Sequence, residues 1–210
     1  MKAFTIEENE FLKKDTKGYY YTDYIAYERR DEVKNYPIFL LTLKNDPNKD
    51  WWDSKLKGAV QSLLEVILNN LPKISDEVKL KPLTVCVIPR SKADNTYRSD
   101  QLLFKETIKN AVNQLGNNFI DGTGFIERHT NTKTTHLRHP IKGFINDGLI
   151  PYPGITKDTC HISEKIIGKD ILLIDDIYTK GIDIDEDAIQ ALIDKGANSV
   201  LFYAVGKTIQ

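Results

Sequence analysis

The segment from residue 170 to residue 205 constrains the fold of this chain more than any other. It begins with the apolar run DILLID (Asp170–Asp175), continues into a helical pattern from about residue 183 to 195, and ends in a second apolar run, SVLFYAV (Ser199–Val205). A strand, a helix and a strand within so few residues predict a βαβ unit, in which the two strands lie parallel in one sheet and the crossover is right-handed.

An earlier part of the chain shows the same order of elements. The run LTVCVI (Leu83–Ile88) is apolar except for Thr84, which is typical of a parallel strand covered on both faces. Helical spacing of apolar residues predicts a helix from about Ser99 to Leu115, and a short strand is expected at Gly124–Arg128. Together these elements predict an α/β fold with an open, mostly parallel sheet and helices on both faces.

The N-terminal region adds an expected strand pair and a helix. The runs Tyr19–Tyr27 and Pro37–Lys44 are rich in aromatic and branched residues, which favours two strands. From about Asp53 to Leu71 the apolar residues follow the 3.6-residue period of a helix, and Pro72 lies just beyond the expected end.

The chain has 210 residues, which is enough for one sizeable core. We therefore expect a single domain in which residues 1–80, the strand pair and helix, pack on a core of residues 81–210 and could form a hood over it. The charges nearly balance, with 29 basic and 30 acidic residues, so no bulk attraction to nucleic acid or to an anionic membrane is expected.

The cysteines and the N-terminal residues bear on the cellular compartment. Cys86 and Cys160 lie far apart without a CxxC pair, which excludes a zinc ribbon and favours a reducing compartment. The opening residues, MKAFTIEENEFLKK, lack the apolar core of a secretory signal, and no run approaches the ~18–20 apolar residues of a membrane span. We expect a cytoplasmic protein.

Two adjacent acids, Asp175 and Asp176, stand at the end of the most apolar strand. Ligands of open parallel sheets bind beyond the carboxyl ends of the strands, and carboxylates are costly to bury for packing alone. These two could accept hydrogen bonds from vicinal hydroxyls or hold a divalent metal through its waters. The following turn, Thr179–Gly181, offers a hydroxyl, backbone N–H groups and a glycine before a helix, which suits a phosphate. The alternative is a solvated acidic turn.

The run ILLIDDIYTKG (Ile171–Gly181) resembles the phosphoribosyl pyrophosphate signature of type I phosphoribosyltransferases. The resemblance implies the fold of that family, with Asp175 and Asp176 as catalytic residues on the ribose hydroxyls. It also implies Mg²⁺, which these two acids contact only indirectly, through water or ribose. The residues implied to bind the 5′-phosphate are Thr179, Lys180, Gly181 and Asp183.

The chain departs from this signature in the turn. The family usually has Thr-Thr-Gly-x-Thr/Ser, whereas this sequence has TKGID. Lys180 adds a positive charge, but Asp183 at a helix N-cap would accept the N–H groups that cradle phosphate and would place negative charge beside it. Either phosphate binding is weakened, or the group is held differently. For Asp185 and Asp187 the simpler interpretation is a favourable interaction with the helix dipole.

Two further segments fit the resemblance. The family holds the pyrophosphate in a loop after an earlier strand, and the corresponding residues here are Arg90, Ser91 and Lys92, of which the two cations could neutralise the diphosphate. The order of elements is similar to the ComF-like branch, although the zinc-binding cysteines common there are absent. A polar segment before the signature is implied to be a mobile loop, with candidates Arg128, His129, Lys133 and Arg138. Solvated basic turns are the alternative for both segments.

The resemblance implies an enzyme that transfers phosphoribose from phosphoribosyl pyrophosphate to a nitrogenous base, in the first instance a purine. More narrowly, DDIYTKG and VLFYAVGKT are similar to ShosT-like phosphoribosyltransferase toxins of bacterial phage defence, which disturb nucleotide metabolism and are paired with a DprA-like antitoxin. The alternatives are a non-catalytic sensor of phosphoribosyl pyrophosphate or nucleotide, and a competence accessory protein acting through a DNA-processing partner. A homodimer is a further expectation, because dimers are the commonest symmetric oligomers.

Overall fold

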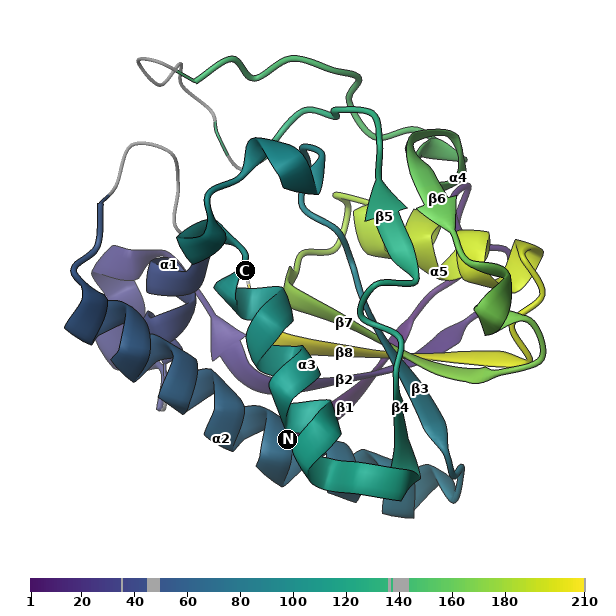
Figure 1. Ribbon diagram of the computed structural model, residues 1–210, viewed down its shortest axis with the longest axis horizontal. Coiled ribbons are helices and arrows are strands. Elements are labelled where there is room, and N and C mark those ends of the chain that lie inside the picture. Colours follow the sequence, from purple (N-terminus) through teal and green to yellow (C-terminus); the bar gives the residue numbers. More distant parts are fainter. Residues whose placement is uncertain (35, 45–49, 136, 138–143, 210) are drawn as a thin grey trace.

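The computed structural model describes residues 1–34, 36–44, 50–135, 137 and 144–209 (Figure 1). A six-stranded sheet forms the centre of the molecule. In spatial order its strands are β1 (Lys2–Ile6), β2 (Thr16–Tyr24), β8 (Ser199–Thr208), β7 (Asp170–Tyr178), β3 (Leu83–Val87) and β4 (Phe119–Asp121). The pair β1–β2 is antiparallel and every other neighbouring pair is parallel. The predicted α/β fold with a mostly parallel sheet is confirmed.

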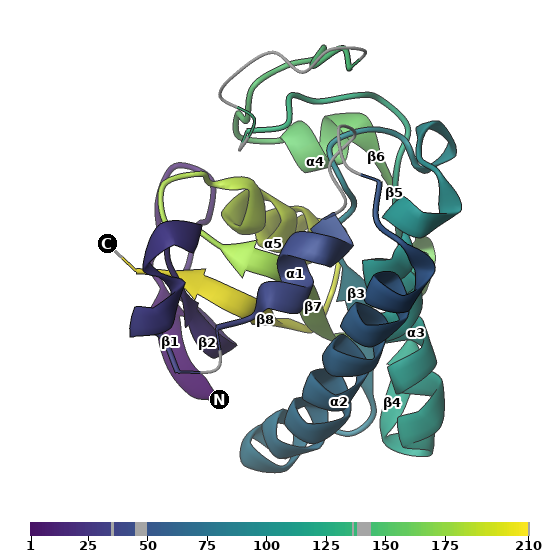
Figure 2. The same ribbon diagram turned by 90° about the vertical axis from the view of Figure 1, so that its left-hand side faces the viewer.

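Helices cover both faces of this sheet. They are α1 (Ile38–Lys44), α2 (Asp53–Val78), α3 (Leu103–Leu115), α4 (Ile155–Thr159) and α5 (Ile184–Asp194). Figure 2 shows α5 on one side of the sheet and α2 with α3 on the other. A small antiparallel pair, β5 (Ile126–Arg128) and β6 (Cys160–Ile162), lies beside the main sheet. No helix in the described part of the chain is long and apolar enough to cross a membrane.

The alternation of side chains along β7 explains why the sheet has helices on both faces. Leu172 and Ile174 are fully buried in the core under α1, α2 and α3, whereas Ile171 and Leu173 are fully buried in the core under α5. Burying such a side chain contributes about 1.5–3 kcal/mol. Since both faces of the strand are covered, its sequence is continuously apolar until Asp175.

The predicted strand at Pro37–Lys44 is wrong, because this segment forms α1. Leu40 and Leu43, one helical turn apart, are both buried, and their packing outweighs the strand propensity of the run. The strand pair of the N-terminal region instead consists of β1 and β2, and β2 also pairs in parallel with β8. Residues of the expected N-terminal unit are therefore hydrogen-bonded into the same sheet as residues 199–208.

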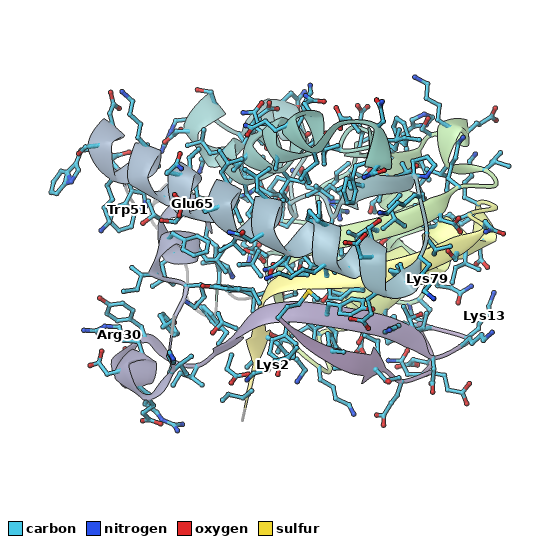
Figure 3. All side chains as sticks on the ribbon, turned by 90° about the horizontal axis from the view of Figure 1, so that it is seen from below. Lys2, Lys13, Arg30, Trp51, Glu65 and Lys79 are labelled. Carbon is cyan, nitrogen blue, oxygen red and sulfur yellow. The ribbon has the colours of Figure 1, made fainter. Side chains whose placement is uncertain are left out.

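Helix α2 continues past its predicted end at Leu71 and contains Pro72 (Figure 3, where it runs from the side of Trp51 to that of Lys79). Proline removes one backbone hydrogen bond from a helix. The apolar stripe nevertheless continues, with Ile74 fully buried, and this burial offsets the loss. The helix ends at Lys79, whose left-handed backbone (φ 57°) lets its N–H bond to the carbonyl of Ser75.

Candidate functional site

A cavity of about 550 Å³ lies at the carboxyl ends of the parallel strands. Asp175 and Asp176 of β7 line it, as do Pro89 and Arg90 just after β3 and Thr208 at the end of β8. This is the edge at which an open parallel sheet places its ligands. The predicted crevice beside the two acids is therefore present.

The N-terminal region supplies one wall of the cavity. Its lining residues there are Tyr24, Leu40, Leu41, Leu43 and Lys44. Tyr97, between β3 and α3, and Phe104, in the first turn of α3, add further apolar surface. One part of the cavity is thus apolar and aromatic, and the rest carries charges of both signs.

Strand β7 extends three residues beyond its predicted end at Asp175, so that Asp176 also lies within the strand. Oδ2 of Asp176 lies 3.7 Å from Nζ of Lys44, and its Oδ1 accepts a hydrogen bond of 2.7 Å from the N–H of Ile177. Asp176 therefore has one cationic and one backbone partner. Lys44 was not among the residues predicted for the site.

Asp175 has a different neighbour, the buried Asp185 in the first turn of α5. Burial, followed by the negative charge of Asp176, raises the pKa of Asp175 to about 7. Burial, followed by the charge of Asp175, raises the pKa of Asp185 well above its ordinary value. Two carboxyl groups this close together in a buried place repel each other when both are charged, which favours a state in which one of them holds a proton.

Asp185 lines the cavity although only 5% of the residue is exposed. Its role was predicted to be an interaction with the helix dipole, and the structure gives it a more specific position. Asp187, which had the same predicted role, points elsewhere: its carboxylate accepts backbone N–H groups of Gly154 and Thr156, the latter at 2.6 Å. Asp187 thus joins α5 to the start of α4.

The structure brings Arg90 and Ser91 of the predicted pyrophosphate loop into the cavity lining. Nη1 of Arg90 donates to the Gln101 carbonyl at 2.9 Å, and its guanidinium lies 4.6 Å from the centre of the Tyr97 ring. Arg128, one of the predicted mobile-loop residues, also lines the cavity and donates from Nε to the Arg90 carbonyl at 2.6 Å. Two arginines are therefore held against each other at this wall.

Lys92, the third residue predicted for the pyrophosphate, does not line the cavity. Only 4% of it is exposed, and Nζ donates to the Thr132 carbonyl at 2.7 Å and to both the carbonyl and the carboxylate of Asp147. This ion pair lowers the pKa of Asp147. The ammonium group of Lys92 therefore bonds within the protein, where it connects the segment around Thr132 to that around Asp147.

The remaining residues predicted for the mobile loop do not all lie at the cavity. Lys133 lines the cavity, whereas His129 is exposed outside it and hydrogen-bonds to Oγ1 of Thr130. Arg138 lies outside the described residues.

Of the turn predicted to bind the 5′-phosphate, only part lines the cavity. Thr179 lines the cavity, and its hydroxyl hydrogen-bonds to that of Thr208 at 2.7 Å. Lys180 instead forms an exposed ion pair of 2.6 Å with Glu7. Gly181 has a left-handed backbone (φ 84°) and, like Lys180, does not line the cavity.

Asp183 stands at the N-cap position of α5, but the predicted capping hydrogen bond is absent. Its backbone is left-handed (φ 63°), and its carboxylate accepts a hydrogen bond of 3.2 Å from Nδ2 of Asn9. The N-terminal segment therefore holds both Lys180 and Asp183, and Asp183 does not compete for the N–H groups at the start of the helix.

Comparison with known proteins adds no further assignment: no family model matches the sequence, and no curated protein is significantly similar to it. The lining of the cavity itself combines both signs of charge. Acids come from β7 and α5, and cations come from the loop after β3, from β5 and the segment after it, and from α1. Such a cavity suits a ligand that combines hydroxyl groups with anionic groups.

Proposed function

We propose that the protein binds phosphoribosyl pyrophosphate with Mg²⁺ and transfers the phosphoribosyl group to a nitrogenous base, in the first instance a purine. One observation carries this proposal: a single cavity contains both the adjacent acids of the resembling signature and Arg90 and Ser91, which come from a different strand–loop unit. A solvated acidic turn would not require a basic loop opposite it.

The acids and the arginines have different roles in the proposed reaction. Asp175 and Asp176 accept hydrogen bonds from the ribose hydroxyls. Arg90 and Arg128 stabilise the diphosphate as it leaves with the electrons of its bond to C1, while the ring nitrogen of the base forms a new bond to C1 and loses its proton. Such a reaction needs positioning and charge stabilisation more than a protein nucleophile.

The cavity offers Mg²⁺ two adjacent carboxylates, those of Asp175 and Asp176, rather than a complete set of protein ligands. Within the described residues no group of three or more acids, histidines or cysteines could hold a metal ion. Mg²⁺ is commonly bound through one or two carboxylates together with substrate phosphates and waters, and Asp175 and Asp176 would hold it indirectly, through water or ribose. When bound, the ion would neutralise charge on the diphosphate.

The N-terminal wall supports the expected hood. Tyr24 and the leucines of α1 line the cavity and offer the apolar surface that a planar base requires. The base would therefore lie between the N-terminal region and the ribose.

The test combines phosphoribosyl pyrophosphate, Mg²⁺ and a panel of purine and pyrimidine bases, with pyrophosphate release and nucleotide formation followed by mass spectrometry. Replacing both Asp175 and Asp176 by Ala should abolish turnover. A double variant that is as active as the wild type would refute the assignment.

One observation favours a second candidate, a non-catalytic sensor. Lys180 and Asp183 contact Glu7 and Asn9 rather than lining the cavity, so the turn lacks part of the predicted phosphate contacts. Calorimetry separates the two candidates, since a sensor binds phosphoribosyl pyrophosphate but releases no pyrophosphate with any base. A toxin role with a DprA-like partner rests on the resemblance alone, and co-purification of the two proteins would test it.

A further inference from the structure

Asp185 differs from Asp176 in its hydrogen bonding. Asp176 has the Lys44 ammonium and the Ile177 N–H as partners. Within the described part of the chain no donor reaches Oδ1 of Asp185, although this atom is fully buried. Glu186 also has one buried oxygen without a partner, but its other oxygen accepts from the hydroxyl of Tyr178 and the residue does not line the cavity.

A buried carboxyl oxygen without a donor is unfavourable for folding. Leaving such a group unsatisfied costs about 1–3 kcal/mol, and more where the group is charged. Asp175 lies beside it and adds repulsion unless a proton is shared. Groups that are locally unfavourable and face a cavity are characteristic of binding sites, where a ligand supplies the missing partner.

We propose that Asp185 is a third ligand-binding acid, whose free oxygen accepts a hydrogen bond from a hydroxyl of the bound sugar and makes the cavity select ribose over deoxyribose. This inference rests on the proposed function, because the sugar is that of phosphoribosyl pyrophosphate. It goes beyond that function by assigning sugar specificity to a residue outside the signature Ile171–Gly181. A buried acceptor rejects a ligand that lacks the matching donor more strongly than it favours the correct one.

The position of Asp185 suits this role. It lies on α5, next to Asp175 on β7, and lines the same cavity as the two acids of the strand. Burial holds the Asp185 side chain in place before the ligand arrives, since only 5% of the residue is exposed. Preorganised acceptors of this kind distinguish ligands that differ by a single hydroxyl.

The experiment is calorimetric titration of the full chain with ribose 5-phosphate and with 2-deoxyribose 5-phosphate. The wild type should prefer ribose by about tenfold, the worth of one hydrogen bond to a charged group. Asp185→Ala should remove most of that preference. Asp185→Asn keeps the shape and one acceptor oxygen but loses the charge, and should reduce the preference by about threefold. Asp194→Asn, an exposed acid-to-amide change on the same helix, is the control and should keep the wild-type ratio.

Thermal melting supplies a second readout that a purely structural residue would not give. Asp185→Asn can donate to Asp175 and removes a repulsion, so its melting temperature should equal or exceed that of the wild type while its sugar preference falls. Wild-type preference in both Asp185 variants would overturn this inference and leave the proposed function standing. An equal loss in Asp194→Asn would also overturn it. Failure of the wild type to bind either sugar phosphate would overturn both.

Discussion

Nζ of Lys44 lies 3.7 Å from Oδ2 of Asp176, and this contact joins the N-terminal helix α1 to the central strand β7. The two residues are separated by most of the chain. Their side chains are partly shielded, with exposed fractions of 21% and 28%. The N-terminal region therefore contributes a charge to the site as well as an apolar wall.

Replacing Lys44 by Met should weaken binding of phosphoribosyl pyrophosphate severalfold, because the cavity loses a cation that orients Asp176. The free energy of unfolding should fall by less than about 1 kcal/mol, since partly exposed ion pairs contribute little. Calorimetry and urea unfolding measure the two effects. Lys57→Met, an exposed lysine on α2, is the matched control. A large loss of stability with unchanged affinity would contradict this role.

Stability should fall as the pH rises between about 4 and about 7. The folded state raises the pKa of Asp175 from 3.8 to about 7, so in this window the folded chain binds a proton that the unfolded chain has lost. Because the folded state then holds more protons, unfolding becomes easier with increasing pH. Urea unfolding across this range measures the slope. Asp185→Asn should flatten it, and an unchanged slope in that variant would argue against coupling of the two acids.

Asp187→Ala should destabilise the protein by about 2–4 kcal/mol, because two backbone N–H groups, that of the part-buried Gly154 and that of the buried Thr156, lose their acceptor. Denaturant unfolding gives the value. Asp158→Ala on the neighbouring α4 removes only an exposed hydrogen bond to the Tyr152 hydroxyl and should cost less than about 1 kcal/mol. Similar losses in both variants would show that Asp187 does not anchor the segment.

Lys92 and Arg90 should behave in opposite ways, although both were predicted to bind the diphosphate. Lys92→Met leaves the carbonyls of Thr132 and Asp147 without their donor, so unfolding free energy should fall by about 1–3 kcal/mol. Arg90→Met should instead weaken binding of pyrophosphate by about tenfold, the worth of a charged hydrogen bond, with a smaller change in stability. Thermal melting and pyrophosphate titration distinguish them. If both variants lost the same affinity for pyrophosphate, Lys92 would have to be counted among the residues that bind the diphosphate.

The sequence predicted best the elements with strong periodicity on both sides of the sheet. The strands Leu83–Val87, Asp170–Tyr178 and Ser199–Thr208 each contain a short, mostly apolar buried run, and the order strand, helix, strand identified these runs as parallel strands. The βαβ order then placed Asp175 and Asp176 at the correct edge of the sheet.

The elements and site residues that were predicted wrongly or missed from the sequence have specific physical causes. Pro37–Lys44 is short and apolar, and a run of this length does not distinguish a strand from a buried helix. Strands β1 and β6 have five and three residues, too few for a clear pattern. Lys44 and Asp185 belong to the cavity only through tertiary packing, since neither lies in a motif. Asp185 in particular had an adequate local explanation as a first-turn acid of a helix.

The pairing of β2 with β8 has a consequence for biosynthesis. Residues 16–24 leave the ribosome long before residues 199–208 and can pair only with β1, not with β8, until translation of that segment is complete. The wall that carries Lys44 is tied to this late pairing. A nascent or prematurely terminated chain would therefore lack an assembled cavity and be inert.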